Sequence, residues 1–359
     1  MQINKVTLNN FRNINRADIE LGCGINVFYG DNGQGKTNFL ESIYFASMGR
    51  SHRSSKDKEL INIDQAKASA RVYTQSKHHQ DCISFEIEKD NKKINVNNMP
   101  IKKLGDLFGH LLCVIFSPED LSLLKMGPQV RRRFMDMELC QLYPSYYYNL
   151  RMYYNVVRQR NNLLRSVKTN PNLTDTLDIW EGQMVTYGIP LMDARAKFTK
   201  EISAIAYKNQ KEITGGKDEL EMVYKNHTDE SSFLDKLVKS RSIDIARGFT
   251  SVGVHKDDIE FKINGKQAKS YASQGQQRTA ALSVKLAEIE LIKDKLDQTP
   301  VLLLDDLLSE LDASRQGFLV DKMSGLQSVI TMTGAEGNFK KYVGKAGAKV
   351  FKVEGGVIS

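Results

Sequence analysis

The chain has 359 residues, of which 41% are hydrophobic, so it can bury a substantial core in one large domain or a few smaller ones. Its formal net charge is +8, which favours a polyanionic partner, nucleic acid before a membrane surface, although many basic proteins bind no nucleic acid. The four cysteines form no C-x-x-C pair and no apolar run approaches about 18 residues, so we expect a cytoplasmic protein without disulfides, cysteine-based zinc sites or membrane association.

Three strands are predicted near the N-terminus. Residues 2–8 and 17–21 alternate between apolar and polar side chains, as strands with one buried face do. The run 25–29 is apolar and rich in β-branched and aromatic residues, which is typical of a buried parallel strand. Arg12 lies between the first two strands, and we expect it either to contact a nucleotide or to be an ordinary surface arginine.

The third strand is followed by a phosphate-binding loop. The sequence Gly30-Asp31-Asn32-Gly33-Gln34-Gly35-Lys36-Thr37 matches the pattern G-x-x-x-x-G-K-[ST], and Asn38 follows it. Glycines let the backbone curl so that its N–H groups point at phosphate oxygens, and the helix predicted over 36–48 directs its positive dipole end at the same anion. The pattern predicts that Lys36 reaches the β- and γ-phosphates of ATP and that the Thr37 hydroxyl ligates Mg²⁺.

The middle of the chain contains a β-subdomain and then a helical arm. Alternating segments within 66–97 predict antiparallel strands, with a turn at 91–93, and residues 111–116 form a second buried-strand run. The basic segment 49–58 is expected to be either a phosphate- or DNA-contacting loop or a solvated one. The arginines at 131–133 are expected either to contact DNA or to pair with Asp136 and Glu138. Two long helices are predicted between 144 and 213, broken at Pro171 and ended by Gly215, and their tyrosines are expected mainly to pack between them.

A third buried-strand run, 301–304, is followed by a pair of carboxylates, Asp305 and Asp306. Asp305 occupies the place of a Walker B acid, so it is expected to hold Mg²⁺ together with Thr37. Alternation along a strand points neighbouring side chains in different directions, so Asp306 needs a different role. We expect it to orient or deprotonate the attacking water.

The segment Ser273-Gln274-Gly275-Gln276-Gln277-Arg278 comes before a helix predicted over 279–296 and has the form of an ABC-type signature motif. The Ser273 hydroxyl, the backbone amides around Gly275 and Gln276 and the helix dipole would form a second phosphate site. One nucleotide needs only one phosphate loop, so this second site is expected to cover the γ-phosphate of ATP bound by another subunit. An ordinary polar helix N-terminus is the alternative.

Together these motifs resemble the RecF family, bacterial DNA replication and repair proteins in the SMC/ABC-type ATPase superfamily. The resemblance covers nearly the whole chain and rests on the phosphate loop with Asn38, Phe11-Arg12-Asn13, Ser117-Pro118-Glu119-Asp120-Leu121, Ser273 to Arg278, and Leu304 to Asp312. It implies an α/β fold: an ABC-type P-loop ATPase head (1–120 and 249–359) with an antiparallel β-subdomain, and an inserted helical arm (121–248).

The resemblance also implies a function. A family member is expected to form an ATP-dependent homodimer that clamps double-stranded and gapped or single-stranded DNA without sequence preference. It is expected to hydrolyse ATP slowly to ADP and phosphate, with stimulation by DNA, and to act as a recombination mediator. RecR is the expected partner, with RecO and RecA acting in the same process, which loads RecA at gaps and supports replication, repair and the SOS response.

The chain departs from related proteins at several positions. Val254 and Lys256 stand where the family usually has Pro and Arg, and no histidine follows His255, so the switch histidine of ABC transporters is absent. We expect a threonine from 331–333, or a bound water, to contact the γ-phosphate instead. Asp306 has one methylene less than the Glu of many relatives outside the family, which predicts slow turnover.

Three other kinds of ATPase fit this sequence less well. An SMC-like structural ATPase subunit without a repair-loading role needs a long series of heptads between the two halves of the head, and this sequence has none. A metabolic kinase would not need the Ser273 to Arg278 segment, and a transporter ATPase would need surfaces that couple to a membrane domain.

Overall fold

The computed structural model describes residues 1–77, 79–334 and 348–359, and the chain divides into two compact units. The first contains Met1–Asp120 and Lys285–Ser359, and the second contains Leu121–Val284. The division after Asp120 agrees with the predicted end of the first head segment, whereas the other division falls inside a helix. The assignment of 249–284 to the ATPase head stays a prediction. No helix in the described ranges is long and apolar enough to cross a membrane.

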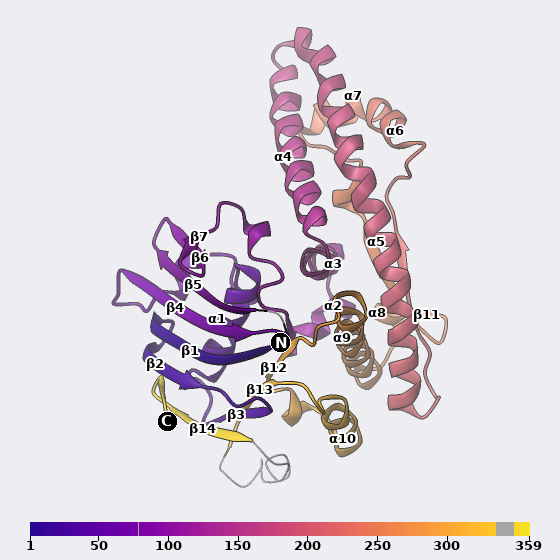
Figure 1. Ribbon diagram of the computed structural model, residues 1–359. Helices are drawn as coiled ribbons and strands as arrows, with labels where there is room; N and C mark the ends of the chain where they lie inside the picture. The colour runs from indigo at the N-terminus through magenta and orange to yellow at the C-terminus, as the bar shows by residue number, and fades with distance from the viewer. Residues whose placement is uncertain (78, 335–347) are drawn as a thin grey trace. The chain divides into compact units, whose positions relative to one another are not determined.

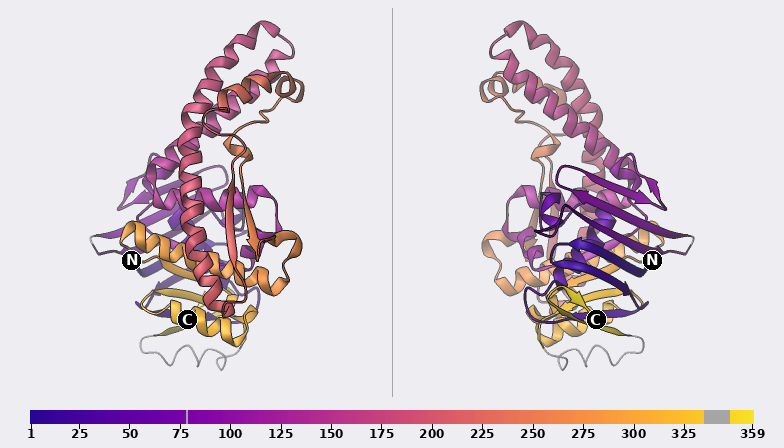
Figure 2. Two further views of the ribbon diagram at one scale, coloured as in Figure 1. Left: turned by 90° about the vertical axis from the view of Figure 1, so that its right-hand side faces the viewer. Right: turned by 90° about the vertical axis from the view of Figure 1, so that its left-hand side faces the viewer.

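The first unit contains a six-stranded antiparallel sheet in the order β2-β1-β4-β5-β6-β7. Every second residue of β4 and β5 is buried, as expected when one face packs on a core. The strands, in indigo and purple, face the viewer in the right-hand view of Figure 2. The turn predicted at 91–93 lies slightly earlier, because Lys92 already belongs to β6. The strands are β1 (Gln2–Phe11), β2 (Ile14–Glu20), β4 (Lys67–Gln75), β5 (Gln80–Glu88), β6 (Lys92–Val96) and β7 (Met99–Pro100).

A second sheet of the same unit has the order β15-β14-β3-β13-β12-β8 and is parallel from β14 to β8. Its inner strands are continuous buried runs, because both faces are covered. β13 lies between β3 and β12, so the carboxyl ends of the three strands meet at one edge, where open α/β sheets bind ligands. The strands are β3 (Ile25–Tyr29), β8 (Cys113–Phe116), β12 (Val301–Asp305), β13 (Ser328–Met332), β14 (Lys349–Glu354) and β15 (Val357–Ile358).

Helix α1 (Lys36–Met48) lies between these two sheets (Figure 1). Phe39 stacks on Phe28 of β3 with ring centroids 4.4 Å apart, while Phe45 packs against Phe85 of β5 at 4.5 Å. Apolar contacts on opposite faces bury the helix on nearly all sides, and this fixes the position of its first turn. The other helical segments of this unit are η1 (Asp57–Leu60), η2 (Leu104–Asp106), η3 (Pro118–Leu121, which ends at the boundary), η6 (Leu307–Glu310) and α10 (Ala313–Lys322), together with the C-terminal part of α9 (Gln274–Leu296).

The second unit is built around the long helices α4 and α5, which run side by side (Figure 1). α5 continues through Pro190 and ends at Gly215, whose φ of 61° is the left-handed conformation that glycine adopts without strain. Strand β9 packs beside α5, and β10 and β11 extend the sheet that it begins. The elements are α2 (Ser122–Lys125), α3 (Pro128–Leu142), α4 (Pro144–Val167), η4 (Pro171–Thr176), α5 (Leu177–Thr214), β9 (Leu220–Lys225), α6 (Phe233–Lys239), α7 (Arg241–Arg247), η5 (Val254–Lys256), β10 (Asp258–Ile263), β11 (Lys266–Gln267) and α8 (Ala268–Tyr271).

Buried arginines connect the elements of this unit. Arg160 on α4 is fully buried and donates hydrogen bonds to Glu181 on α5 at 2.9 Å and to Asp244 on α7 at 2.7 Å. Arg195 on α5 pairs with Asp257 at 3.1 Å. Arg131 pairs with Asp258 at 2.6 Å rather than with the expected Asp136 or Glu138. Such arginines are accommodated because their charges are fully paired.

Tyrosines of α4 occupy both buried and exposed positions. Tyr146 and Tyr153 are buried, whereas 52% of Tyr148 and 42% of Tyr154 are exposed to solvent. The Tyr146 hydroxyl donates to Asp136 and accepts from the Arg195 guanidinium. The buried pair thus packs inside the arm, as expected, and the partly exposed Tyr148 also contacts Tyr187 of α5, with ring centroids 6.3 Å apart.

Candidate nucleotide-binding site

The loop between β3 and α1 has the backbone conformation that its sequence predicts. Gly30, Gly33 and Gly35 have φ angles of 154°, 80° and 114°. A Cβ on Gly30 would lie 2.2 Å from the carbonyl oxygen of Val353, and one on Gly35 would lie 2.7 Å from Asn13 Oδ1. Gly30 therefore requires glycine both for its conformation and for its close backbone neighbour, whereas Gly33 and Gly35 require it for their conformation.

Two further contacts hold the loop from outside. Gln34 is bound by the β14–β15 turn, since its carbonyl oxygen accepts from the Gly356 N–H at 2.9 Å and its side chain accepts from the Gly355 N–H at 2.6 Å. Asn13 accepts a 2.8 Å hydrogen bond from the Asn38 side chain. The C-terminal hairpin was not predicted to support the site, and no feature of the sequence near it indicated this contact.

Lys36 lies inside the curve of the loop. Its ammonium donates to the carbonyl oxygens of Gly30 and Asp31, both at 2.7 Å. Burial lowers the pKa of Lys36 from its ordinary value, while Asp306, Asp305 and Asp31 act in the opposite direction. The loop's own carbonyls thus hold the cation where a phosphate oxygen could replace them as its partners.

Thr37 and Asp305 meet at the edge of the parallel sheet. The Thr37 hydroxyl donates to Asp305 Oδ1 at 2.7 Å, and the Thr331 hydroxyl donates to the same oxygen at 2.8 Å. Hydroxyl and carboxylate oxygens are the ligands that Mg²⁺ prefers, so this pair fits the ion that the sequence predicts. Thr331 has a role in the site because β13 lies between the strands that carry the other two residues.

Asp306 follows with a change of backbone direction. Its φ of 49° is left-handed, which is uncommon outside glycine and often marks a functional position. Its N–H donates to Thr331 Oγ1 at 2.9 Å, and its Oδ1 accepts from Thr333 Oγ1 at 3.4 Å. The turn separates the directions of the two acids, as separate roles for Asp305 and Asp306 require. Thr331 and Thr333 lie in the segment that was expected to replace the switch histidine. Both contact the acidic pair, Thr331 through Asp305 Oδ1 and the Asp306 N–H and Thr333 through Asp306 Oδ1.

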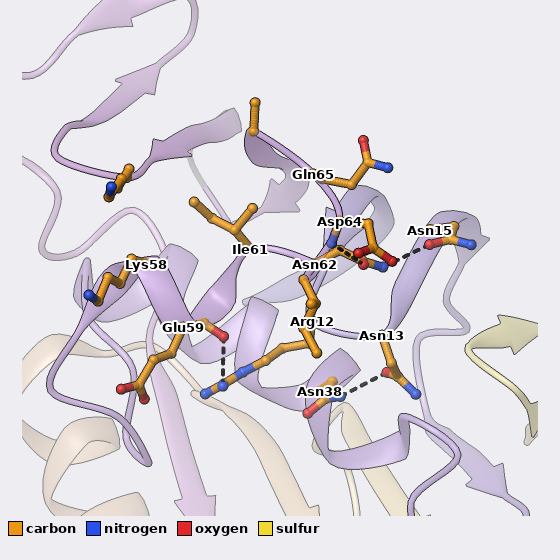
Figure 3. A pocket seen from close by; sticks show the side chains of 13 residues that line it. Arg12, Asn13, Asn15, Asn38, Lys58, Glu59, Ile61, Asn62, Asp64 and Gln65 are labelled. Atoms are coloured by element: carbon orange, nitrogen blue, oxygen red, sulfur yellow. Dashed lines mark hydrogen bonds between the residues drawn. The ribbon is translucent and has the colours of Figure 1, made fainter.

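Arg12 lines a pocket beside the start of α1 together with Asn13, Asn38 and Glu59 (Figure 3). Its guanidinium makes a bidentate pair with Glu41 at 3.0 and 2.9 Å and donates to the Glu59 carbonyl oxygen at 2.7 Å. Arg12 is thus a half-buried, ion-paired residue rather than an ordinary surface arginine, and its contact with nucleotide stays a prediction.

The basic segment 49–58 is anchored to the same helix. Arg53 donates to Asn38 Oδ1 at 3.2 Å and lies 3.8 Å from Glu41, and the Ser51 hydroxyl donates to Glu41 at 2.5 Å. Burial alone would raise the pKa of Glu41, but hydrogen bonds from Arg12 and Ser51 outweigh it and lower the pKa overall. Glu41 was not identified from the sequence, because an acid in the middle of an apolar helix has no motif around it.

The signature-like segment lies in the second unit, at the start of α9. The Ser273 hydroxyl accepts from the Gln276 N–H at 3.2 Å, and the Gln276 side chain accepts from the Ser273 N–H at 3.0 Å, which is a capping box. Ser273 is exposed, and the Gln276 amide also donates to Asp218 at 3.0 Å. Both predictions for this segment, a helix N-terminus and a phosphate site, are compatible with this geometry, and the helix begins earlier than predicted.

The segment after Asp306 forms the turn η6, and Asp312 then caps α10 by accepting from the Arg315 N–H at 2.9 Å. The side chains of Ser309 and Glu310, which belong to the predicted D-loop, lie outside the described part of the structure.

Comparisons with known proteins agree on one family. The family described as RecF/RecN/SMC N terminal domain matches residues 2–359. Among curated relatives, the DNA replication and repair protein RecF of Clostridium tetani is 45% identical over 99% of both chains, and that of Acetivibrio thermocellus is 42% identical over 94% of both.

Solved structures give the same picture. The recombination mediator protein RecF in complex with ATP, from the RecFOR pathway, superimposes with a TM-score of 0.93 at 34% identity and covers 99% of this chain and 96% of its own. The Smc head domain of Pyrococcus furiosus superimposes with a TM-score of 0.56 at 14% identity, a likeness in fold alone. These matches confirm the predicted fold class, an SMC/ABC-type ATPase head with mixed α/β sheets and a long helical arm.

Proposed function

The chain belongs to the RecF family of DNA replication and repair proteins, and we propose that it is an ATP-driven, DNA-binding recombination mediator. ATP hydrolysis is a general property of the wider RecF and SMC-type ATPase family. The observation that carries the proposal for this chain is the meeting of Lys36, Thr37 and Asp305 at one sheet edge. A cation inside a glycine loop beside a hydroxyl–carboxylate pair is what binding of a magnesium nucleotide requires.

In this proposal the phosphate loop holds the triphosphate through its backbone amides and Lys36. Thr37 and Asp305 would hold Mg²⁺, which neutralises charge on the phosphates when bound. Asp306 accepts a proton from, or orients, the attacking water, and Thr331 and Thr333 fix its backbone and carboxylate. The short reach of Asp306 supports slow turnover.

ATP would act by joining two copies of the chain. Ser273 is exposed at the start of α9, a helix of 23 residues whose dipole favours an anion. We assign this helix end to the γ-phosphate of ATP held by the partner subunit, together with Gly275 and Gln276. A ligand bound between subunits stabilises only the dimer, so ATP closes the dimer and hydrolysis opens it.

In this proposal the closed dimer binds DNA, either duplex or gapped. The net charge of +8 supplies a sequence-independent, salt-sensitive attraction to phosphates, and binding is expected to stimulate hydrolysis. The pathway in which the solved relative acts supports RecR and RecO as partners and the loading of RecA at gaps as the outcome.

An SMC-like structural role without repair loading is the second candidate. Its supporting observation is the likeness to Smc heads, but α4 and α5, at 24 and 38 residues, are too short to act as an SMC-type arm. The fold thus favours the mediator over the structural subunit.

Light scattering of the eluting protein during gel filtration tests the proposal. With ATP and Mg²⁺ the wild-type chain is expected to elute as a dimer, more so with duplex DNA, and with ADP as a monomer. Ser273→Arg should still bind ATP yet stay monomeric, because an arginine blocks the helix end. A wild-type chain that remains monomeric with ATP and DNA would rule out dimerisation driven by ATP.

A further inference from the structure

Two histidines and an aspartate of the first unit, His79, Asp81 and His110, lie close together. His79 immediately precedes β5, Asp81 is the second residue of β5, and His110 lies between η2 and β8. One ligand atom from each residue lies within 4.8 Å of the other two. None of the residues assigned to nucleotide binding belongs to this cluster.

The geometry within the cluster is convergent. His79 Nε2 lies 3.2 Å and His110 Nδ1 lies 2.8 Å from the same carboxylate oxygen, Asp81 Oδ2. In a tetrahedral zinc site with bonds near 2.1 Å, ligand atoms lie about 3.4 Å apart, which is close to both of these distances. The Asp81 side chain is 4% exposed, against 43% for His79 and 32% for His110, so the anion is buried while an entry path remains open.

The surroundings of the three residues match an outer ligand shell. The Ser76 hydroxyl lies 3.1 Å from His79 Nδ1, so it can accept the proton of that nitrogen and leave Nε2 free for a metal. The Asn97 side chain donates to Asp81 Oδ1 at 2.7 Å, which directs Oδ2 toward the histidines. The Thr74 hydroxyl donates to the His110 carbonyl oxygen at 3.2 Å and fixes its backbone.

We propose that His79, Asp81 and His110 form a binding site for a divalent transition-metal ion, with zinc as its occupant. Two imidazole nitrogens and one carboxylate favour zinc over the oxygen-seeking Mg²⁺, and three protein ligands leave a position for water. The site joins the β4–β5 hairpin to the segment that leads into β8, and β8 pairs with β12, the strand that carries Asp305. The bound ion therefore stabilises the first unit.

Competition with a chromophoric chelator measures zinc binding directly. The full chain without a purification tag is stripped with EDTA, desalted and titrated with zinc chloride in excess Mg²⁺, which occupies oxygen-ligand sites without competing for imidazole. We expect one zinc per chain with micromolar or tighter affinity. The double variant His79→Gln/His110→Gln should bind at least about 100-fold more weakly, since outer-shell partners alone contribute 10–100-fold.

Two controls separate this site from general histidine binding and from loss of folding. His227→Gln removes an exposed histidine of the second unit and should bind zinc as the wild type does. Zinc should raise the thermal midpoint of the wild type but not of the double variant, and Co²⁺ should give the visible absorption of a low-symmetry site in the wild type alone. Absence of stoichiometric zinc, or equal affinity in the double variant, would show that the cluster is only a hydrogen-bonded triad.

Discussion

Thr37 and Asp305 are 268 positions apart in the chain, yet the Thr37 hydroxyl donates a 2.7 Å hydrogen bond to Asp305 Oδ1. One residue begins α1 and the other ends β12, and β13 between them adds a third oxygen through Thr331. The fold of the first unit thus holds the two proposed Mg²⁺ ligands in contact with each other.

Removing the hydroxyl should therefore abolish hydrolysis that depends on Mg²⁺. Thr37→Ala is expected to lower the ATPase rate at least about 100-fold, because the ion that neutralises the phosphates loses a ligand. Thr37→Ser keeps the hydroxyl and should retain most of the rate. The phosphate-release assay is decisive here: equal rates for the alanine and serine variants would remove Thr37 from the metal site.

Asp306 should matter for chemistry and not for binding. Asp306→Asn is expected to lower the ATPase rate by about 10²–10⁴-fold, the usual contribution of a general base, while ATP still forms the dimer. Asp306→Glu keeps the carboxylate and is the matched control. Single-turnover hydrolysis and gel filtration on the same samples separate the two effects, and a variant that loses dimer and hydrolysis together would argue against this role.

The buried arginine of the arm offers a test of stability. Arg160→Met leaves the buried Asp244 without an arginine partner and leaves Glu181 with Arg241 alone, so it should lower the free energy of unfolding by about 3–5 kcal/mol. Arg160→Lys keeps the positive charge but loses the planar guanidinium that donates to both acids, so it should lower the free energy of unfolding by less than Arg160→Met does. Thermal unfolding monitored by circular dichroism gives the order, and a methionine variant as stable as the wild type would contradict this interpretation of the pair.

The strand, loop and helix of the site could be predicted from the sequence, whereas the residues that hold them in place from elsewhere in the chain could not. Ile25–Tyr29 and Lys36–Met48 have the predicted bounds, because a short apolar run, a glycine loop and a helix start are local signals. Glu41 and the contact of Gln34 with the β14–β15 turn depend on residues brought together only by tertiary folding. Strand β9 escaped prediction for the same reason, since its pairing partner, β10, lies more than 30 residues later.

The buried His255 is expected to make the stability of the second unit depend on pH. Its Nε2 faces the Thr250 carbonyl oxygen at 3.1 Å and its Nδ1 faces the Tyr153 hydroxyl at 2.9 Å, so the neutral ring is satisfied. Burial is the main cause that lowers the pKa of His255 to about 4.

The unfolded chain takes up this proton below about pH 6.5, whereas the folded chain resists it until about pH 4. The stabilisation is therefore present above pH 6.5 and is lost as the pH falls toward 4. The difference in thermal midpoint between pH 7.5 and pH 5 should shrink in His255→Gln. An unchanged difference would exclude His255 as a cause of acid sensitivity.

The central claim is that one subunit binds ATP and its twin completes the site. Mixing two inactive variants, Lys36→Ala and Ser273→Arg, tests it most directly through the ATPase rate with duplex DNA. Random pairing gives mixed dimers in which one of the two sites has both Lys36 and Ser273 intact, so the mixture should recover up to about a quarter of the wild-type rate, while each variant alone stays inactive. A mixture as inactive as its components, or full activity of Ser273→Arg alone, would contradict a pocket shared between subunits.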